Sequence, residues 1–410
     1  MRFASSTSLL RKSQNFTLLL TGSTVSVLGN RIALLAFPLL VLAETGSAVW
    51  AGWVGFANLI PSLLLSVPAG PLVARWNPRR TMLACESGRG LAIVVVVASV
   101  LWSQSSEIFV LLVASFVEGS LGVLYTLAEV RLLRIIVSPE QTPAALAGIE
   151  GRTSLAALLG RPLGGLLFDI GRLMPFAIDV LSFLVSVLTL LGIRVDKSSA
   201  THREENADHN DGLWGGVINI VRDPYLRWAA LASGCSTAVF QAAYLIFITD
   251  ATFSGASSFT IGLAFACTGL GGILGSMGAK RLFDRHGFRV ALCSQWICAA
   301  VLPFLILSID VWMFAIVSSI ITFAGVAANV AVNTYMFYRV PDRLVSQVVG
   351  VDKMLGSVGA ALGPLAGGLL YSSLGTTISL ACLAAVSVLL ATLMTSVRAI
   401  RIPPAAEPVT

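Results

Sequence analysis

The sequence predicts an all-α polytopic membrane protein with twelve transmembrane helices, arranged as two pseudo-symmetric bundles of six. Three observations predict this fold class. Hydrophobic residues make up 56% of the 410 residues, charged residues make up 12%, and the mean hydropathy is +0.85, whereas about 25% of the residues of soluble domains are charged. Apolar runs long enough to cross a bilayer follow one another along the chain, and elements of the first half recur in the second.

Each predicted span has roughly the 20 apolar residues needed to cross about 30 Å of hydrocarbon. In chain order the spans cover residues 16–42, 50–73, 82–102, 108–130, 147–170, 174–194, 226–249, 259–280, 290–308, 311–337, 347–372 and 375–397. The first apolar run is too long for the corresponding region of a cleaved signal peptide. We therefore expect an uncleaved first span.

One long polar break, residues 195–213, divides the spans into six and six. We expect an N-terminal bundle over residues 1–194, a cytoplasmic linker and interfacial segment over 195–225, and a C-terminal bundle over 226–410. The stretch LWGGVINIVRDPYLRW before the seventh span has Trp and Arg residues that suit the headgroup region. So little chain remains outside the spans that the helices and their short loops must carry the function.

Basic residues are distributed unevenly between alternate loops. Of the 27 Lys and Arg, 23 lie on one side of the predicted membrane, Arg172 lies on the other, and Arg31, Arg89 and Arg161 lie within spans. Because cytoplasmic loops are enriched in Lys and Arg, we expect a multi-pass protein of the plasma (inner) membrane with both termini in the cytoplasm. The excess of basic residues on the cytoplasmic side of the lipid bilayer accounts for the net charge of +6. A nucleic-acid partner is therefore not expected.

The sequence shows neither a catalytic constellation nor the spacing of a metal site. The six cysteines lie in or beside apolar runs, without disulfide or zinc spacing. His202 and His209 lie in the polar linker, where solvated side chains are a simpler interpretation than a metal pair. We predict no enzyme, no metal and no cofactor, and a proton gradient as the source of energy. A channel, which needs rings of carbonyls or charges, and a scaffold with a soluble module are not indicated.

The loop after the second span, GPLVARWNPRR (residues 70–80), has a counterpart in the second half. An offset of 210 residues aligns it with KRLFDRHGFRV, so that Arg75 corresponds to Arg285 and Arg79 to Arg289. An offset of 203 aligns GRPLGGLL at 160–167 with GPLAGGLL at 363–370. Two parallel six-span repeats indicate a secondary transporter whose substrate site lies between the halves, near the middle of the bilayer.

The chain resembles the major facilitator superfamily over nearly its whole length. The loop resembles that family's signature Gly-x-Leu-Ala-Asp-Arg-x-Gly-Arg-Arg, with Ala74 in place of the Asp and Asn77 in place of the Gly, whereas the second copy keeps Asp284 and Gly287. The stretches TGSA, ARWNPRR, GRPLGGLL and PFAIDVLSF resemble the branch of drug exporters that includes macrolide-efflux proteins and the enterobactin exporter.

The resemblance implies that this loop is a cytoplasmic latch. In the family the Asp lies against the N-terminus of span 11, where the helix dipole favours it, and an Arg pairs with an acid at the end of span 4. Glu129 is the suitable partner for Arg79 here. Because Ala74 has no carboxylate, we expect the second copy to carry more of the closure. The predicted gate residues are Arg75, Arg79, Arg80, Glu129, Asp284, Arg285, Gly287 and Arg289.

Small residues recur in spans 5 and 11 and predict close helix packing. The resemblance implies in addition that a Gly-Pro motif in span 5 bends the helix and seals the cavity of drug exporters. Here Arg161 takes the usual place of the proline. The predicted packing residues are Gly160, Pro162, Gly164, Gly165, Gly363, Pro364, Gly367 and Gly368.

Ionisable residues within spans are costly and mark functional sites. By depth along their helices, Arg31 and Glu118 lie near the bilayer centre, and the resemblance implies that they meet across a cavity lined by spans 1, 4, 7 and 10. Asp179, nearer the outer end of span 6, is expected to be a structural acid, while Glu86 and Arg89 lie near the inner end of span 3. The predicted substrate and proton cavity consists of Asn30, Arg31, Glu118, Arg161, Gln241, Tyr244, Asn329 and Asn333.

Two interpretations of the central charges stay open. In one, Arg31, Glu118 and Arg161 form a permanent ion network that orients the helices. In the other, Glu118 takes up a proton when the cavity opens outward and couples proton entry to substrate release. Members of the branch often have an Asp where Asn30 stands, so the resemblance implies that the proton site has moved or been lost.

These features together predict a monomeric secondary active transporter that exports an amphipathic small molecule of antibiotic, macrolide or siderophore type. We expect alternating access, proton antiport and a role in drug resistance. Proton-coupled uptake of a small metabolite is the alternative.

Overall fold

The computed structural model describes residues 2–65, 68–102, 107–137, 142–193, 214–307, 310–340 and 342–396. These residues form helices joined by short turns, and no strand occurs among them. Helices satisfy their own backbone N–H and C=O groups, which is what a chain surrounded by lipid requires. The linker 195–213, with His202 and His209, lies outside the described residues.

Contacts divide the chain into two units, Met1–Leu40 with Ala57–Asp208 and Val41–Phe56 with His209–Thr410. The predicted boundary at residue 194 stays a prediction. The first helices in chain order are α1 (Arg2–Thr45), α2 (Ala48–Leu65), α3 (Ala69–Ala74), α4 (Pro78–Trp102), α5 (Glu107–Ile136), α6 (Thr142–Ile170) and α7 (Met174–Gly192). The others are α8 (Trp214–Arg222), α9 (Pro224–Phe253), α10 (Ser258–His286), η3 (Gly287–Arg289), α11 (Val290–Val301), α12 (Phe304–Leu307), α13 (Val311–Arg339) and α14 (Asp342–Ser396).

Nine stretches of the described chain are long and apolar enough to cross a membrane. Two of them, Ser258–Ile306 and Gln347–Ser396, are 49 and 50 residues long, and each contains two predicted spans. The nine stretches therefore account for eleven of the twelve predicted spans. Helix α6, which carries Arg152 and Arg161, contains the remaining span, the fifth in chain order. The predicted all-α, multi-pass membrane fold is confirmed.

Helix α14 is broken at Gly375, where φ is 73° and ψ is 179°. This left-handed backbone favours glycine because other residues clash there. The hydroxyl of Thr376 donates a hydrogen bond of 2.6 Å to Oδ1 of Asp250, near the end of α9. Glycine and carboxylate together form the corner between the eleventh and twelfth predicted spans.

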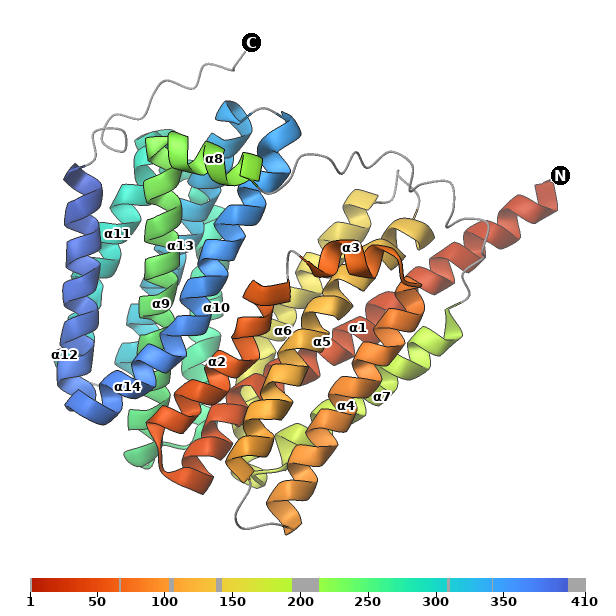
Figure 1. Ribbon diagram of the computed structural model, residues 1–410, viewed down its shortest axis with the longest axis horizontal. Helices are drawn as coiled ribbons and strands as arrows, with labels where there is room; N and C mark the ends of the chain where they lie inside the picture. Colours follow the sequence, from red (N-terminus) through yellow and green to blue (C-terminus); the bar gives the residue numbers. More distant parts are fainter. Residues whose placement is uncertain are drawn as a thin grey trace. The chain divides into compact units, whose positions relative to one another are not determined.

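Glycines bring equivalent helices into close contact in each unit. A Cβ on Gly164 of α6 would lie 2.5 Å from the carbonyl oxygen of Ile32 in α1, and one on Gly367 of α14 would lie 2.6 Å from that of Ala242 in α9. Both distances are too short for any side chain, so the backbones touch, as in small-xxx-small packing. Within the second unit, α14 runs along α9 (Figure 1). The two halves therefore repeat the contact between their first and fifth spans.

Candidate functional site

The carboxylate of Glu118 in α5 is buried, with 4% of the residue exposed. Its Oε1 accepts hydrogen bonds from the amide of Asn30 in α1 and, at 2.8 Å, from Nη2 of Arg89 in α4. Its Oε2 accepts a bond of 2.5 Å from the amide of Asn58 in α2. One acid thus connects α5 to three neighbouring helices, and we name Glu118, Arg89, Asn30 and Asn58 the Glu118 cluster.

Asn58 reaches Glu118 because the next residue of α5 is a glycine. A Cβ on Gly119 would collide with the carbonyl oxygen of Asn58, so α2 and α5 can touch at this level only where α5 has no side chain. Asn58 was not among the predicted site residues. The sequence did hold a signal for it, namely a single amide in the apolar run of the second span.

Arg89 is surrounded by acids and by an aromatic ring. Its side chain is 7% exposed, and its guanidinium carbon lies 4.6 Å from the centre of the Phe183 ring. Besides its ion pair with Glu118, it interacts electrostatically with Glu86 and Asp179. Three acids of the first unit therefore share this arginine in a region that excludes water, where charge interactions are strong.

Glu86 of α4 is fully buried. Oε1 accepts hydrogen bonds of 2.9 Å from the hydroxyls of Ser26 in α1 and Ser186 in α7. Such bonds satisfy a carboxylate that has left water. These two hydrogen bonds extend the polar contacts of the Glu118 cluster along α1, α4 and α7.

Asp179 of α7 is also fully buried, and its Oδ2 has no hydrogen-bond partner among the described residues. Helix α1 passes directly over it, since a Cβ on Gly29 would lie 2.8 Å from Asp179 Oδ1 and would collide with the hydroxyl of Ser182. The stretch PFAIDVLSF thus forms the seam between α7 and α1.

Arg89 pairs with Glu118, a partner that the sequence did not indicate, and the expected meeting of Arg31 with Glu118 stays a prediction. Depth along a helix indicates how far a residue lies from each surface but not the direction in which its side chain points. Arg31 and Arg161 are both half-buried, and the Cβ of Arg31 packs against Gly160. Helices α4 and α5 are direct neighbours (Figure 1), and this brings Arg89 to Glu118.

The expected pair between Arg79 and Glu129 is not formed. Glu129 of α5 instead makes two hydrogen bonds of 2.7 Å with the guanidinium of Arg152 in α6, and each side chain is 7% exposed. Arg152 also donates to the hydroxyl of Ser23 in α1. The fork of an arginine matches the two oxygens of a carboxylate, so this buried pair joins α5, α6 and α1.

Arg79 caps the end of α7 instead. Its Nε and Nη2 each donate a bond of 2.8 Å, to the carbonyl oxygens of Leu190 and Leu191. These are among the last carbonyls of the helix, which have no partner within it. Arg131 of α5 donates in the same way to the carbonyls of Val73 and, at 3.1 Å, Trp76. The arginines therefore tie the loop to α5 and α7 of its own unit.

Asn77 departs from the family signature because it starts a helix. Its Oδ1 accepts a hydrogen bond of 3.1 Å from the backbone N–H of Arg80, and Pro78 is the first residue of α4. Asn before Pro is a favourable helix start. In the second copy Gly287 ends α10 with φ of 56°, a conformation that favours glycine.

The other predicted gate residues lie at the surface. Asp284, Arg285 and Arg289 of the second copy are exposed, as are Arg75 and Arg80 of the first. The latch stays a prediction.

The polar residues predicted for the second half lie on α9 and α13. The Cβ of Gln241 packs against Gly363, and the ring of Tyr244 lies 4.2 Å from that of Phe265. The amide of Asn333 donates a bond of 2.9 Å to Oδ1 of Asn329. The remaining glycines and prolines of the packing motif, except the half-buried Pro162, are buried: Gly165, Pro364 and Gly368.

Metal ligands are not gathered anywhere in the described part of the chain, where no three His, Cys, Asp or Glu residues form a group that could hold an ion. The six cysteines are free thiols; Cys85 is buried, and Cys235 and Cys293 are exposed.

Apolar helices that span a membrane, a contact repeated between the two halves and charged residues buried between spans together define a secondary transporter. The family model of the Major Facilitator Superfamily matches residues 19–254 and 229–409. The chain belongs to this superfamily, and it is a transporter and not an enzyme.

Three known proteins show how this chain relates to the superfamily. It is 28% identical over 412 residues to an uncharacterized MFS-type transporter, y4rN, of Sinorhizobium fredii, and the alignment covers 95% of each chain. It is 24% identical over 379 residues to the multidrug efflux pump Tap of Mycobacterium tuberculosis, covering 87% of each. The solved structure of a bacterial homologue of the human lysosomal transporter Spinster, inward-facing and unoccupied, matches with a TM-score of 0.71 at 14% identity, covering 93% of this chain and 96% of that one.

Proposed function

We propose that this transporter exports an amphipathic small molecule from the cytoplasm in exchange for protons, by alternating access. The observation that carries the proposal is the Glu118 cluster, a buried acid held by donors from three helices of one unit. In this proposal the protein acts as a monomer in the plasma membrane with both termini in the cytoplasm. Bundles 1–194 and 226–410 move about the linker 195–225, and the proton gradient is the only energy source.

In this proposal Glu118 is the residue that carries the proton. Three acids share the guanidinium of Arg89, and burying unpaired negative charge is costly. A proton on Glu118 would remove its attraction for Arg89 and weaken its bonds to the two amides, since a charged acceptor makes hydrogen bonds roughly twice as strong as a neutral one. Protonation would therefore loosen α1, α2 and α4 from α5 together, which is how proton entry would change the conformation.

Export is supported by the names of the relatives. Tap of Mycobacterium tuberculosis and Multidrug resistance protein 1 of Bacillus subtilis, each 24% identical to this chain, are described as acting in drug efflux or resistance. The stretches that resemble drug exporters point the same way. The runner-up is proton-coupled uptake of a small metabolite, and the direction of transport in the assay below separates the two.

Transport into inside-out vesicles tests the proposal with a panel of antibiotics and siderophores under an imposed pH gradient. Wild type should accumulate a substrate when the vesicle interior is acidic. Glu118→Gln should retain counterflow of that substrate, because the amide keeps the shape of the side chain, and should lose accumulation driven by the gradient. Asp169→Asn, which neutralises an exposed acid of α6, is the matched control and should keep both activities.

Other results contradict the proposal. Gradient-driven accumulation by Glu118→Gln at the wild-type level would remove Glu118 from coupling. Loss of folded protein in the variant would favour the permanent ion network instead. Accumulation only in right-side-out vesicles would replace export with uptake.

A further inference from the structure

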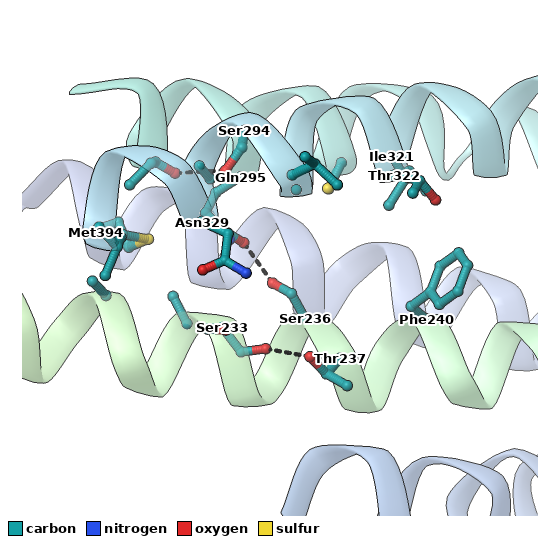
Figure 2. Close-up of a pocket in the computed structure, with 18 of the residues that line it drawn as sticks. Ser233, Ser236, Thr237, Phe240, Ser294, Gln295, Ile321, Thr322, Asn329 and Met394 are labelled. Atoms are coloured by element: carbon teal, nitrogen blue, oxygen red, sulfur yellow. Dashed lines mark hydrogen bonds between the residues drawn. The ribbon is translucent and has the colours of Figure 1, made fainter. Parts of the chain in front are cut away.

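The second unit contains a cavity of about 320 Å³ between α9, α11, α13 and α14 (Figure 2). Ligand pockets for small molecules commonly measure about 300 to 1,000 Å³, so this one is large enough for a ligand. Serine and threonine hydroxyls line it from α9, α11 and α13, together with the amides of Gln295 and Asn329 and the ring of Phe240. The cavity lies within one unit and is distinct from the Glu118 cluster.

A hydrogen bond beside the cavity repeats one of the first unit. Ser26 donates 2.9 Å to Glu86 between α1 and α4. Ser236, its counterpart at an offset of 210, donates 2.8 Å to Gln295 between α9 and α11, as Figure 2 shows. Gln295 stands at an offset of 209 from Glu86. Both units therefore have this bond, with a charged acceptor in the first unit and a neutral amide in the second.

The charged side chains of the first unit have uncharged counterparts around the cavity. Two offsets extend this comparison: 209 relates α4 to α11, and 203, found for the glycine motifs, relates α5 to α13. The offset of 203 also pairs the buried Ser115 of α5 with the buried Ser318 of α13. Three residues of the Glu118 cluster then correspond to residues that line the cavity: Asn30 to Phe240, Arg89 to Cys298 and Glu118 to Ile321. The cavity therefore lies where the first unit holds its ion cluster.

The charge of the lining restricts what can bind. Among its described residues, Asp352 of α14 is the one acid, and there is no Lys, Arg or His. Oδ1 of Asp352 is buried and has no hydrogen-bond partner in the described part of the chain. An unpaired buried acceptor is costly, so a ligand that brings an N–H donor is favoured and an anion is repelled. Phe240 adds an aromatic face, which attracts cations.

We propose that this cavity is the binding site for an amphipathic cation with amino groups, whose N–H donates a hydrogen bond to Asp352 and whose apolar body packs against Phe240. Hydroxyl or carbonyl groups of the ligand bond to Gln295 and Asn329. The proposal rests on the proposed function only in taking this ligand to be the transported molecule. It selects an amine-bearing substrate over an anionic one.

Binding of ethidium to the full-length protein in nanodiscs of phosphatidylcholine tests the site. Ethidium is a cation with two amino groups, and fluorescein, an anion of comparable size, is the counter-probe. Fluorescence anisotropy should show binding of ethidium only. Asp352→Asn should weaken it about 10- to 100-fold, the loss expected for a hydrogen bond to a charged group. Asp310→Asn, which removes an exposed acid of the same unit, should leave the affinity unchanged.

A second variant tests whether the ligand occupies the space of the cavity, without changing the charge of Asp352. Gly325 lines the cavity, and a Cβ there would meet no atom within 4 Å. Gly325→Leu should fold, because leucine is a better helix former than glycine, and should weaken ethidium binding at least tenfold by filling the cavity.

The possible outcomes are distinguishable. Absence of ethidium binding, equal binding of fluorescein, or unchanged affinity in either Asp352→Asn or Gly325→Leu would overturn the site. If these two variants weaken binding while Glu118→Gln keeps gradient-driven transport, the binding site stands and the proposed coupling fails.

Discussion

The buried pair between Glu129 and Arg152 makes a quantitative prediction about stability. The two hydrogen bonds measure 2.7 Å, and both side chains are 7% exposed. Arg152→Met keeps an apolar chain of similar length but leaves the carboxylate of Glu129 buried and unpaired. Breaking a buried pair on one side costs about 3 to 5 kcal/mol, and the hydroxyl of Ser23 loses a donor worth about 0.5 to 1.5 kcal/mol. We expect the free energy of unfolding of the variant to be about 3.5 to 6.5 kcal/mol lower than that of wild type.

The double variant shows whether lost pairing or lost packing is responsible for the lower stability of Arg152→Met. Replacing both partners, Arg152→Met with Glu129→Leu, removes the unpaired charge, and apolar replacement of a buried ion pair is often neutral or stabilising by about 1 to 4 kcal/mol. The double variant should therefore be clearly more stable than Arg152→Met alone. This non-additivity is the signature of a direct interaction between neighbouring residues.

Unfolding in mixed micelles by increasing fractions of dodecyl sulfate, followed by tryptophan fluorescence, provides the measurement. All four members of the mutant cycle are compared at the same lipid-to-protein ratio. If Arg152→Met lies within about 1 kcal/mol of wild type, as for an exposed ion pair, the pair is hydrated and the reasoning is refuted. Additive effects of the two substitutions would refute it as well.

Three further predictions follow from the same unit. Arg79→Ala should lower the free energy of unfolding by about 1 to 3 kcal/mol through loss of its bonds to the end of α7; its effect should add to that of Glu129→Gln, and non-additivity would restore the latch pair. Ala74→Asp should slow transport or shift the inward/outward balance in spin-label distances if the family's latch contact is available, and no change in either would count against the latch. Gly119→Ala should cost about 1 to 3 kcal/mol because its Cβ meets the carbonyl of Asn58, whereas the same stability as wild type would show that α2 and α5 do not touch.

The membrane fold was predictable because hydropathy responds directly to the solvent. A span must be apolar over a fixed length, so the runs of the sequence mark its helices. The exceptions have local causes. Helix α6 holds Arg152 and Arg161 and is not among the nine stretches of the described chain, although residues 147–170 were predicted as a span from the sequence. Helix α14 continues across two predicted spans because Gly375 turns the chain without an intervening polar loop.

The partners within the site were less predictable. Sequence identified Glu118 as a central charge, but it gave no indication that Arg89 pairs with it. A periodic pattern of apolar residues fixes which face of a helix is buried only when the other face is polar, and in a membrane both faces are apolar. The pairing of α4 with α5 is a property of packing, and neither Arg89 nor Asn58 could be assigned to Glu118 before the helices were placed.

The two repeats have diverged in opposite directions at one level of the fold. The first unit has an acid, an arginine and two amides between its helices, and these fill the space that the second unit leaves as a cavity. A filled ionic site changes its contacts when a proton arrives, whereas an open and nearly uncharged site admits a molecule. If the proposals above hold, the ancestral symmetry was resolved into one half that responds to protons and one half that binds the substrate. Introducing the charge of the first unit into the second separates these roles: Gln295→Glu should leave coupling through Glu118 intact while strengthening the binding of ethidium, and weaker binding of this cation would contradict the assignment.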